Sequence, residues 1–252
     1  MRLVFGVEYD GTEWNGWQTQ ICKNTVQDAI ELALSRFANQ KIKIICAGRT
    51  DSGVHAKGQV IHFDTKVERK IWNWIRGTNS ILPKSIRIKW GSIVSPDFHA
   101  RFSAKSRTYS YTICNTPIES PLSSRSSTWI YQRLNEKKMQ DASKNLLGRH
   151  DFSSFRSSEC QANSPIRIIN RCDLKRDGDF LKMEIEANGF LHHMVRNIMG
   201  CLFEVGRGVE TEEWLKNVLD SKDRKNAAKT LPPQGLCLEH VDYGIDLLCE
   251  RE

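Results

Sequence analysis

Apolar and polar residues alternate along this chain with two different periods, and each change of period predicts where a strand or a helix begins or ends. Residues 2–9 alternate between apolar and polar or small side chains, which predicts a strand. A polar loop with glycines and tryptophans follows over residues 10–24, and its length makes it a candidate contact surface. From Thr25, a helix-capping residue, apolar side chains recur at helical spacing as far as Phe37. We therefore expect a strand, a long loop and an amphipathic helix at the start of the chain.

The same two patterns predict the remaining elements. Further strands are expected over residues 41–46, 59–65, 86–94, 109–113, 166–175, 180–186 and 236–241. Further helices are expected over residues 71–82, 135–147 and 190–205, with a short additional helix starting at Thr211. The Asp177-Gly178 pair predicts a hairpin between two of the strands.

These elements follow the order β, α, β, β, α, β twice, which is the split βαβ plan. We therefore expect an α+β fold of two similar RRM-like or ferredoxin-like halves, with a central mixed or antiparallel sheet and a cleft between the halves. The N-terminal half is expected over residues 1–104 and the C-terminal half over residues 105–252, with the linker region around residues 95–107.

Composition adds a location and a class of partner. Of the 252 residues, 39% are hydrophobic and 27% are charged, as in globular proteins with a substantial core. No apolar run approaches the length of a membrane span, and a predicted strand stands where a signal peptide would, so we expect a cytoplasmic protein without membrane association. The 8 cysteines are scattered singly, and we expect them to be reduced and mostly in the core. The formal charge of +7 favours an anionic partner such as nucleic acid, although a lysine-rich solubilising surface gives the same total.

One turn between two predicted strands carries an unusual set of residues. In the run AGRTDSGVHAKGQ, Asp51 is framed by Arg49 and His55 and bracketed by Gly48 and Gly53. Two glycines this close together allow positive φ angles and a close approach of the backbone to another molecule. Asp-Ser-Gly is also a common turn, in which the carboxylate accepts a bond from a backbone amide. A catalytic role for Asp51 therefore needs support from the rest of the chain.

Residues outside this turn add to the picture. Tyr109 follows the basic run ARFSAKSRT, and Arg196 lies among apolar neighbours in FLHHMVRNIMG. Such an arginine is expected to be partly buried and to need an anion, unless its long stem carries the guanidinium to the surface. The adjacent His192 and His193 are expected on different helix faces. Since no histidine has a CxxC partner or an HExxH frame, we expect no metal site. Walker, GxGxxG and Gly-x-Ser-x-Gly motifs do not occur either.

Four motifs of the chain resemble, in the same order, those of the A-type tRNA pseudouridine synthases: GRTDSGVHAKGQV, RTYSY, HDFSSFRSS and NGFLHHMVRNIMG. The resemblance extends from VEYDGTEWNGWQ to PPQGLCLEHVDY, with slight departures at Ser52 and at the histidine pair. It implies the pseudouridine synthase fold. It also implies conversion of uridine to pseudouridine at positions 38, 39 and 40 in the anticodon stem-loop of tRNA, by a homodimer without a cofactor.

The resemblance also implies a role for individual residues. Asp51 falls on the catalytic aspartate, Tyr109 on the tyrosine that contacts the target base, and Arg49 on the arginine associated with base flipping. Arg196 matches the arginine that pairs with the catalytic carboxylate. We expect His55 to fix the turn or to contact the RNA.

Elementary chemistry agrees with those roles. The isomerisation breaks the bond from N1 to the ribose, turns the uracil and joins C5 to the same carbon, with no redox change. Asp51 could attack C1′, attack the base or act as a proton acceptor, and the sequence leaves all three open. A guanidinium beside the carboxylate would keep it ionised in a pocket that excludes water.

Two other functions fit part of this sequence. Tandem RRM-like halves could bind RNA without catalysis, but no stretch matches an RNP-type aromatic strand motif well. A nucleosidase that used Asp51 would normally carry a second acidic residue close to it, and none is visible. Both alternatives are left to experiment.

Overall fold

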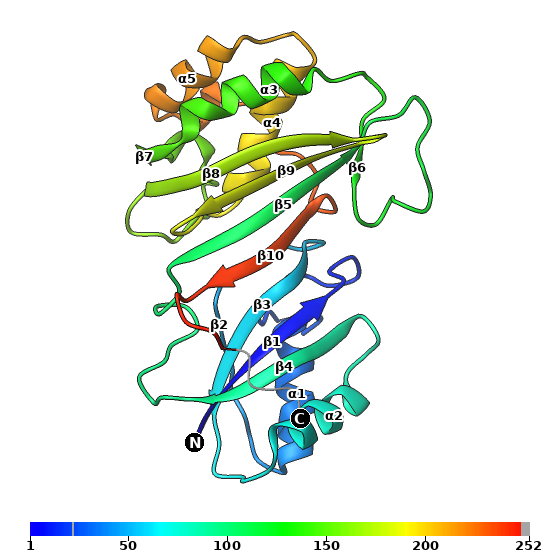
Figure 1. The fold of residues 1–252 in the computed structure, drawn as a ribbon, viewed down its shortest axis with the longest axis vertical. Helices are drawn as coiled ribbons and strands as arrows, with labels where there is room; N and C mark the ends of the chain where they lie inside the picture. Colours follow the sequence, from blue (N-terminus) through cyan, green and yellow to red (C-terminus); the bar gives the residue numbers. More distant parts are fainter. Residues whose placement is uncertain (22, 248–252) are drawn as a thin grey trace. The chain divides into compact units, whose positions relative to one another are not determined.

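The computed structural model describes residues 1–21 and 23–247, which form two compact units (Figure 1). The first unit contains residues 1–105 and residues 238–247, and the second contains residues 106–237. The fold is α+β, as expected. No helix in the described part of the chain has both the length and the apolar character needed to cross a bilayer.

The first unit is built on an antiparallel sheet with β1 (Arg2–Tyr9) in the centre. β1 pairs with β3 (His55–Asp64) on one side and with β4 (Ile86–Val94) on the other. α1 (Val26–Ala38) and α2 (Ile71–Ile81) contact each other and lie together beside this sheet in Figure 1. The buried faces of these elements form the core of the unit around Phe5, Phe63 and Trp74.

The last strand, β10 (Leu236–Asp242), follows β3 in the strand order, and its residues from Leu238 onward belong to the first unit. The two strands approach closely, because a Cβ atom at Gly58 would lie 2.2 Å from the Glu239 carbonyl oxygen. Only glycine fits there. The sequence predicts this closing strand as part of the half over residues 105–252. In the structure, its residues from Leu238 onward instead return to the first unit.

The second unit holds β5 (Ser106–Cys114), β9 (Phe180–Ala187), β8 (Ile166–Asp177) and β7 (Gly148–Asp151), each antiparallel to the next. β6 (Thr128–Trp129) pairs parallel with β5, which makes the sheet mixed. α3 (Glu136–Ser143), α4 (Met194–Gly206) and α5 (Glu212–Ser221) pack against one another over this sheet (Figure 1). α4 is the most buried of the three helices, in keeping with its apolar sequence.

Several elements differ in length from their predicted spans. The expected strand over residues 41–46 is reduced to β2 (Ile45–Cys46). The helix expected over residues 135–147 ends at Ser143 and continues as a 3₁₀ turn over Lys144–Leu146. α4 begins at Met194, four residues later than expected, because His193 adopts a left-handed conformation with φ 62°. Two further 3₁₀ turns lie over Ser153–Phe155 and Arg224–Asn226.

The six cysteines in the described residues form no disulfide. Cys114, Cys172 and Cys201 are buried, whereas the other three, Cys46, Cys160 and Cys237, are partly exposed. Cys22 and Cys249, which were expected to be reduced as well, lie outside the described residues. Reduced thiols stay a prediction, and the expected core position holds for three of the six described cysteines.

Candidate active site

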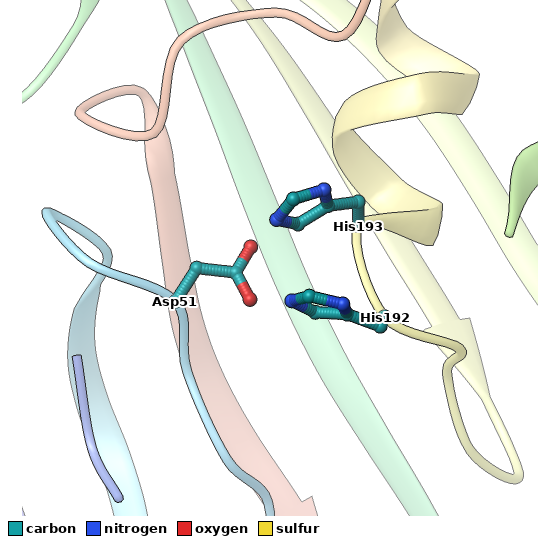
Figure 2. Close-up of side chains that lie close together, drawn as sticks. All are labelled: Asp51, His192 and His193. Atoms are coloured by element: carbon teal, nitrogen blue, oxygen red, sulfur yellow. The ribbon is translucent and has the colours of Figure 1, made fainter. Parts of the chain in front are cut away.

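The first unit presents Asp51 on the loop between β2 and β3, where its side chain is half-buried (Figure 2). Gly53 adopts φ 77°, so the turn uses the left-handed conformation that its glycine permits. The amide of Gly53 donates to the Trp14 carbonyl oxygen at 3.3 Å, and the Ser52 hydroxyl donates to the same oxygen at 3.2 Å. The long loop over residues 10–24 therefore holds this turn from one side.

Gly16 explains why that loop can approach so closely. It has φ 80°, and a Cβ atom there would lie 2.9 Å from the Thr50 carbonyl oxygen. The same oxygen accepts a bond from the Trp17 amide at 3.0 Å, while the Thr50 hydroxyl pairs with the Tyr9 hydroxyl at 2.7 Å. The backbone on the N-terminal side of Asp51 is thus fixed by β1 and by the loop together.

Gln59 holds the start of the same turn from β3. Its side chain is fully buried, its amide nitrogen donates to the Gly48 carbonyl oxygen at 2.6 Å, and its amide oxygen accepts from the Gly48 amide at 3.3 Å. Both ends of the Asp51 turn are therefore tied to neighbouring elements, as a preorganised catalytic group requires.

The other predicted residues of the first unit lie on the same turn. Arg49 is exposed. His55 begins β3, and its Nδ1 accepts a bond from the Gly11 amide at 3.0 Å, so this ring links the turn to the long loop. The bond supports the turn-fixing role expected of His55, which stays a prediction.

The second unit carries Tyr109 and Arg196. Tyr109 lies on β5, is 7% exposed, and packs edge-on against Phe190 with ring centroids 5.1 Å apart. Arg196 lies in the first turn of α4 and is half-buried, as its apolar neighbours predicted. Its Nε donates to the Leu231 carbonyl oxygen at 2.8 Å, which fixes the direction of the guanidinium.

Tyr111 is a buried neighbour of this arginine that the sequence analysis did not single out. Its hydroxyl donates to the Pro232 carbonyl oxygen at 2.7 Å and pairs with the Thr128 hydroxyl at 2.6 Å. Burial raises the pKa of Tyr111 far above its usual value, although the Thr128 hydrogen bond and the positive charge of Arg196 act in the opposite direction. The segment that ends at Pro232 therefore anchors both Arg196 and Tyr111.

The histidine pair is placed differently from expectation. His192 and His193 precede α4 and do not lie on opposite helix faces; their ring centroids are 4.0 Å apart (Figure 2). The left-handed backbone at His193 brings the two rings together, which a continuous helix would not do. That prediction was wrong because it assumed that the helix began before these residues.

The predicted site residues are divided between the two units. Asp51, Arg49 and His55 belong to the first unit, and Tyr109 and Arg196 belong to the second. Gln59 and Tyr111 support these residues and could have been noticed from the sequence. Gln59 is a polar residue at the start of the predicted strand over residues 59–65, and Tyr111 shares a strand face with Tyr109. The Leu231 carbonyl had no sequence signal, since it is a backbone group brought in by the fold.

Similarity to known proteins covers nearly the whole chain, and the family model and the relatives carry the same description. Residues 6–103 and 142–244 match the family model described as tRNA pseudouridine synthase. The protein named tRNA pseudouridine synthase A from Herminiimonas arsenicoxydans is 51% identical to this chain over 246 residues, which cover 96% of this chain and 90% of that protein. The protein of that name from Janthinobacterium sp. (strain Marseille) is 50% identical over 248 residues, covering 96% and 92%. The one from Paraburkholderia phytofirmans is 49% identical over 242 residues, covering 96% and 90%.

Proposed function

Because this chain belongs to the tRNA pseudouridine synthases, isomerases that convert uridine to pseudouridine in tRNA, we propose that it modifies positions 38, 39 and 40 of the anticodon stem-loop with Asp51 as its catalytic carboxylate. The observation that supports this proposal most directly is the Asp51 turn itself. Its two ends are tied by Gln59 and by the loop over residues 10–24, which leaves a half-buried carboxylate on a fixed backbone.

A fixed carboxylate suits this reaction. The bond from N1 to the ribose breaks, the uracil turns, and a bond from C5 to the same carbon forms, after which the C5 proton leaves. Asp51 acts as nucleophile at C1′ or at the base, or as the group that removes a proton. In each case the carboxylate must be ionised when the uridine arrives, and a held guanidinium favours that state.

We assign the other residues supporting parts. A base in a helical stem must leave the stack before any side chain can reach its ring, at a cost of a few kcal/mol. The exposed Arg49 can occupy the vacated space and contact phosphates. Tyr109 stacks on the extruded uracil, Arg196 pairs with the Asp51 carboxylate, and His55 keeps the turn in place next to the RNA.

The proposal extends to the state of the protein. We propose that it acts as a homodimer in the cytoplasm, on tRNA alone and without a cofactor. The formal charge of +7 supports binding to the tRNA backbone.

Replacing the Asp51 carboxylate by an amide tests its assignment as the catalytic group. We expect Asp51→Asn to abolish pseudouridine formation while tRNA binding changes little, because the amide keeps the shape but cannot act as nucleophile or base. An unmodified tRNA transcript with tritium at uracil C5 releases its label to water only when pseudouridine forms. Asp97→Asn, in an exposed loop of the same unit, is the matched control and should keep full activity.

The same assay separates the alternatives. A noncatalytic RNA binder would release no tritium from the wild-type protein, and a nucleosidase would release free uracil. Continued tritium release by Asp51→Asn would remove this carboxylate from the mechanism.

A further inference from the structure

The second unit contains a polar cavity that the proposed chemistry does not use. It has a volume of about 480 Å³ and opens between the start of α4, the segment over residues 153–158 and the segment over residues 224–230. Two guanidinium groups, from Arg156 and Arg224, line it together with several hydroxyl groups, the Asn197 amide and the His193 ring, and no carboxylate does. Its size lies in the range of ligand pockets, and its lining has the chemistry of an anion site.

Arg224 is held in place by neutral partners only. It donates to the Ala227 carbonyl oxygen at 3.1 Å, to Oδ1 of Asn197 at 3.2 Å and to the Thr230 hydroxyl at 3.1 Å. Asn197 is itself 1% exposed and is oriented by a bond from its side-chain nitrogen to the Phe155 carbonyl oxygen at 2.8 Å. The guanidinium is therefore fixed toward the cavity while its positive charge stays uncompensated.

Arg156 is arranged in the same manner on the other side. It donates to the carbonyl oxygens of Cys160 at 2.6 Å and Ala162 at 3.0 Å. Burial of the nearby Cys160 thiol raises its pKa, but the amides of Ala162 and His192 and the Arg156 charge outweigh burial and lower that pKa overall. An electropositive environment is consistent with this shift. Neither arginine has a carboxylate partner among the residues that the structure describes.

We propose that this cavity binds a phosphate group of the tRNA backbone, at a nucleotide that the structure does not identify. Two half-buried guanidinium groups without an acidic partner match the geometry and charge of a phosphate, and hydroxyl donors such as that of Ser157 complete such sites. The proposal rests on tRNA being the substrate. A free phosphate ion shares this chemistry, so the test must separate the two sources.

Ser158 offers a variant that spares the hydrogen-bond network. It lines the cavity, it is exposed, and its side chain has no hydrogen bond within the described residues. Ser158→Asp places a negative charge at the cavity, and Ser158→Asn is the neutral control of the same shape. Arg224→Gln is a poorer test, because losing the bonds to Asn197 and Ala227 could unfold the segment.

We expect Ser158→Asp to weaken binding of an anticodon stem-loop about tenfold, and to reduce the slope of log K against log salt by about 0.7 to 0.9, the loss of one phosphate contact. Ser158→Asn should bind within about twofold of wild type. Stem-loops that carry a single neutral methylphosphonate, each at a different position, then locate the contact. At the phosphate that the cavity binds, the methylphosphonate should lower the affinity of the wild type but should not lower the affinity of Ser158→Asp any further.

Three results would overturn the proposal. Equal binding by the Asp and Asn variants would do so, as would losses that add at every methylphosphonate position. Broadening of the ³¹P signal of inorganic phosphate by the wild type but not by Ser158→Asp, with stem-loop binding unchanged in the variant, would assign the cavity to the free ion. Failure of the proposed function is distinct from all three, because the wild type would then release no tritium from labelled tRNA.

Discussion

At the scale of single residues, Gln59 shows how a buried polar side chain supports a catalytic turn. The nitrogen and the oxygen of its side-chain amide both form hydrogen bonds with the backbone of Gly48, three residues before Asp51. We expect Gln59→Leu to leave the Gly48 amide and carbonyl without these partners and to lower the free energy of unfolding by about 1–3 kcal/mol. Urea denaturation measures that loss. Tritium release should also fall, because the turn that positions Asp51 loses its anchor on β3.

The two effects of Gln59→Leu can be separated. Turnover is to be measured where circular dichroism shows the variant to be fully folded, so that a loss of activity reports the turn and not the folded fraction. Wild-type turnover and stability in this variant would show that the loop over residues 10–24 is sufficient to hold Asp51.

At the scale of elements, His62 connects β3 to the segment after β4. Its Nδ1 accepts a bond from the Ala100 amide at 3.1 Å, and burial, the charge of Arg2 and nearby His99 lower its pKa to about 4. The unfolded chain protonates this histidine near its ordinary value of 6.5, so in the interval between those two values the unfolded state binds more protons. The fold therefore loses stability through His62 as the pH falls from 6.5 toward 4, because the folded protein disfavours the protonated ring, and above pH 6.5 this penalty is absent.

We expect His62→Asn to reduce that pH dependence. The Asn side-chain oxygen can replace Nδ1 as the acceptor for Ala100, but it does not titrate. Between pH 7.5 and pH 4.5, the wild type should lose about 1–2 kcal/mol more unfolding free energy than the variant. Urea denaturation at both pH values gives the difference. Parallel losses in the two proteins would show that other groups cause the acid sensitivity.

The periodicity of apolar residues predicted the bounds of strands and the starts of helices well where the backbone amides form the regular hydrogen bonds of the predicted element. β1 and β4 have the predicted bounds, and Thr25, Asn135 and Thr211 cap their helices. The strand expected over residues 41–46 forms only at residues 45 and 46, because side chains accept the hydrogen bonds of the preceding backbone amides. The Ile42 amide donates to the Ser35 hydroxyl at 2.9 Å and the Ile44 amide to the Glu31 carboxylate at 3.2 Å, so neither amide joins a ladder.

The candidate site was predictable to a different degree. Asp51, Arg49 and Tyr109 stand in motifs, and the half-buried state of Arg196 followed from its apolar neighbours. The support of Arg196 by the Leu231 carbonyl joins segments far apart in the chain, and no local pattern indicates such a bond. The polar cavity of the second unit is likewise assembled from separate segments. Arg156 stands in the motif HDFSSFRSS, but Arg224 lies in none of the quoted motifs, and no local pattern indicates that the two line one cavity.

At the scale of the whole molecule, the chain crosses between its two units twice, after Lys105 and after Cys237. The second crossing returns residues 238–247 to the first unit. There the Asp242 carbonyl accepts from the Lys105 amide at 2.8 Å, and the Tyr243 hydroxyl donates to the Ala100 carbonyl oxygen at 2.7 Å. A linear pattern of strands and helices cannot indicate this return, since a closing strand reads alike in either unit.

The net positive charge predicts that tRNA binding depends strongly on salt concentration. With 37 basic against 30 acidic residues, the protein gains affinity for tRNA mainly by releasing the counterions of the phosphates that it contacts. Each contact contributes about 0.7 to 0.9 to the slope of log K against log salt, so binding should weaken more than about tenfold between 50 and 200 mM KCl. Fluorescence anisotropy with Asp51→Asn measures binding without turnover, and the unfolding free energy at both salt concentrations controls for loss of the fold. If affinity stayed flat over this range, hydrogen bonds and stacking on bases would have to supply the binding energy in place of phosphate contacts.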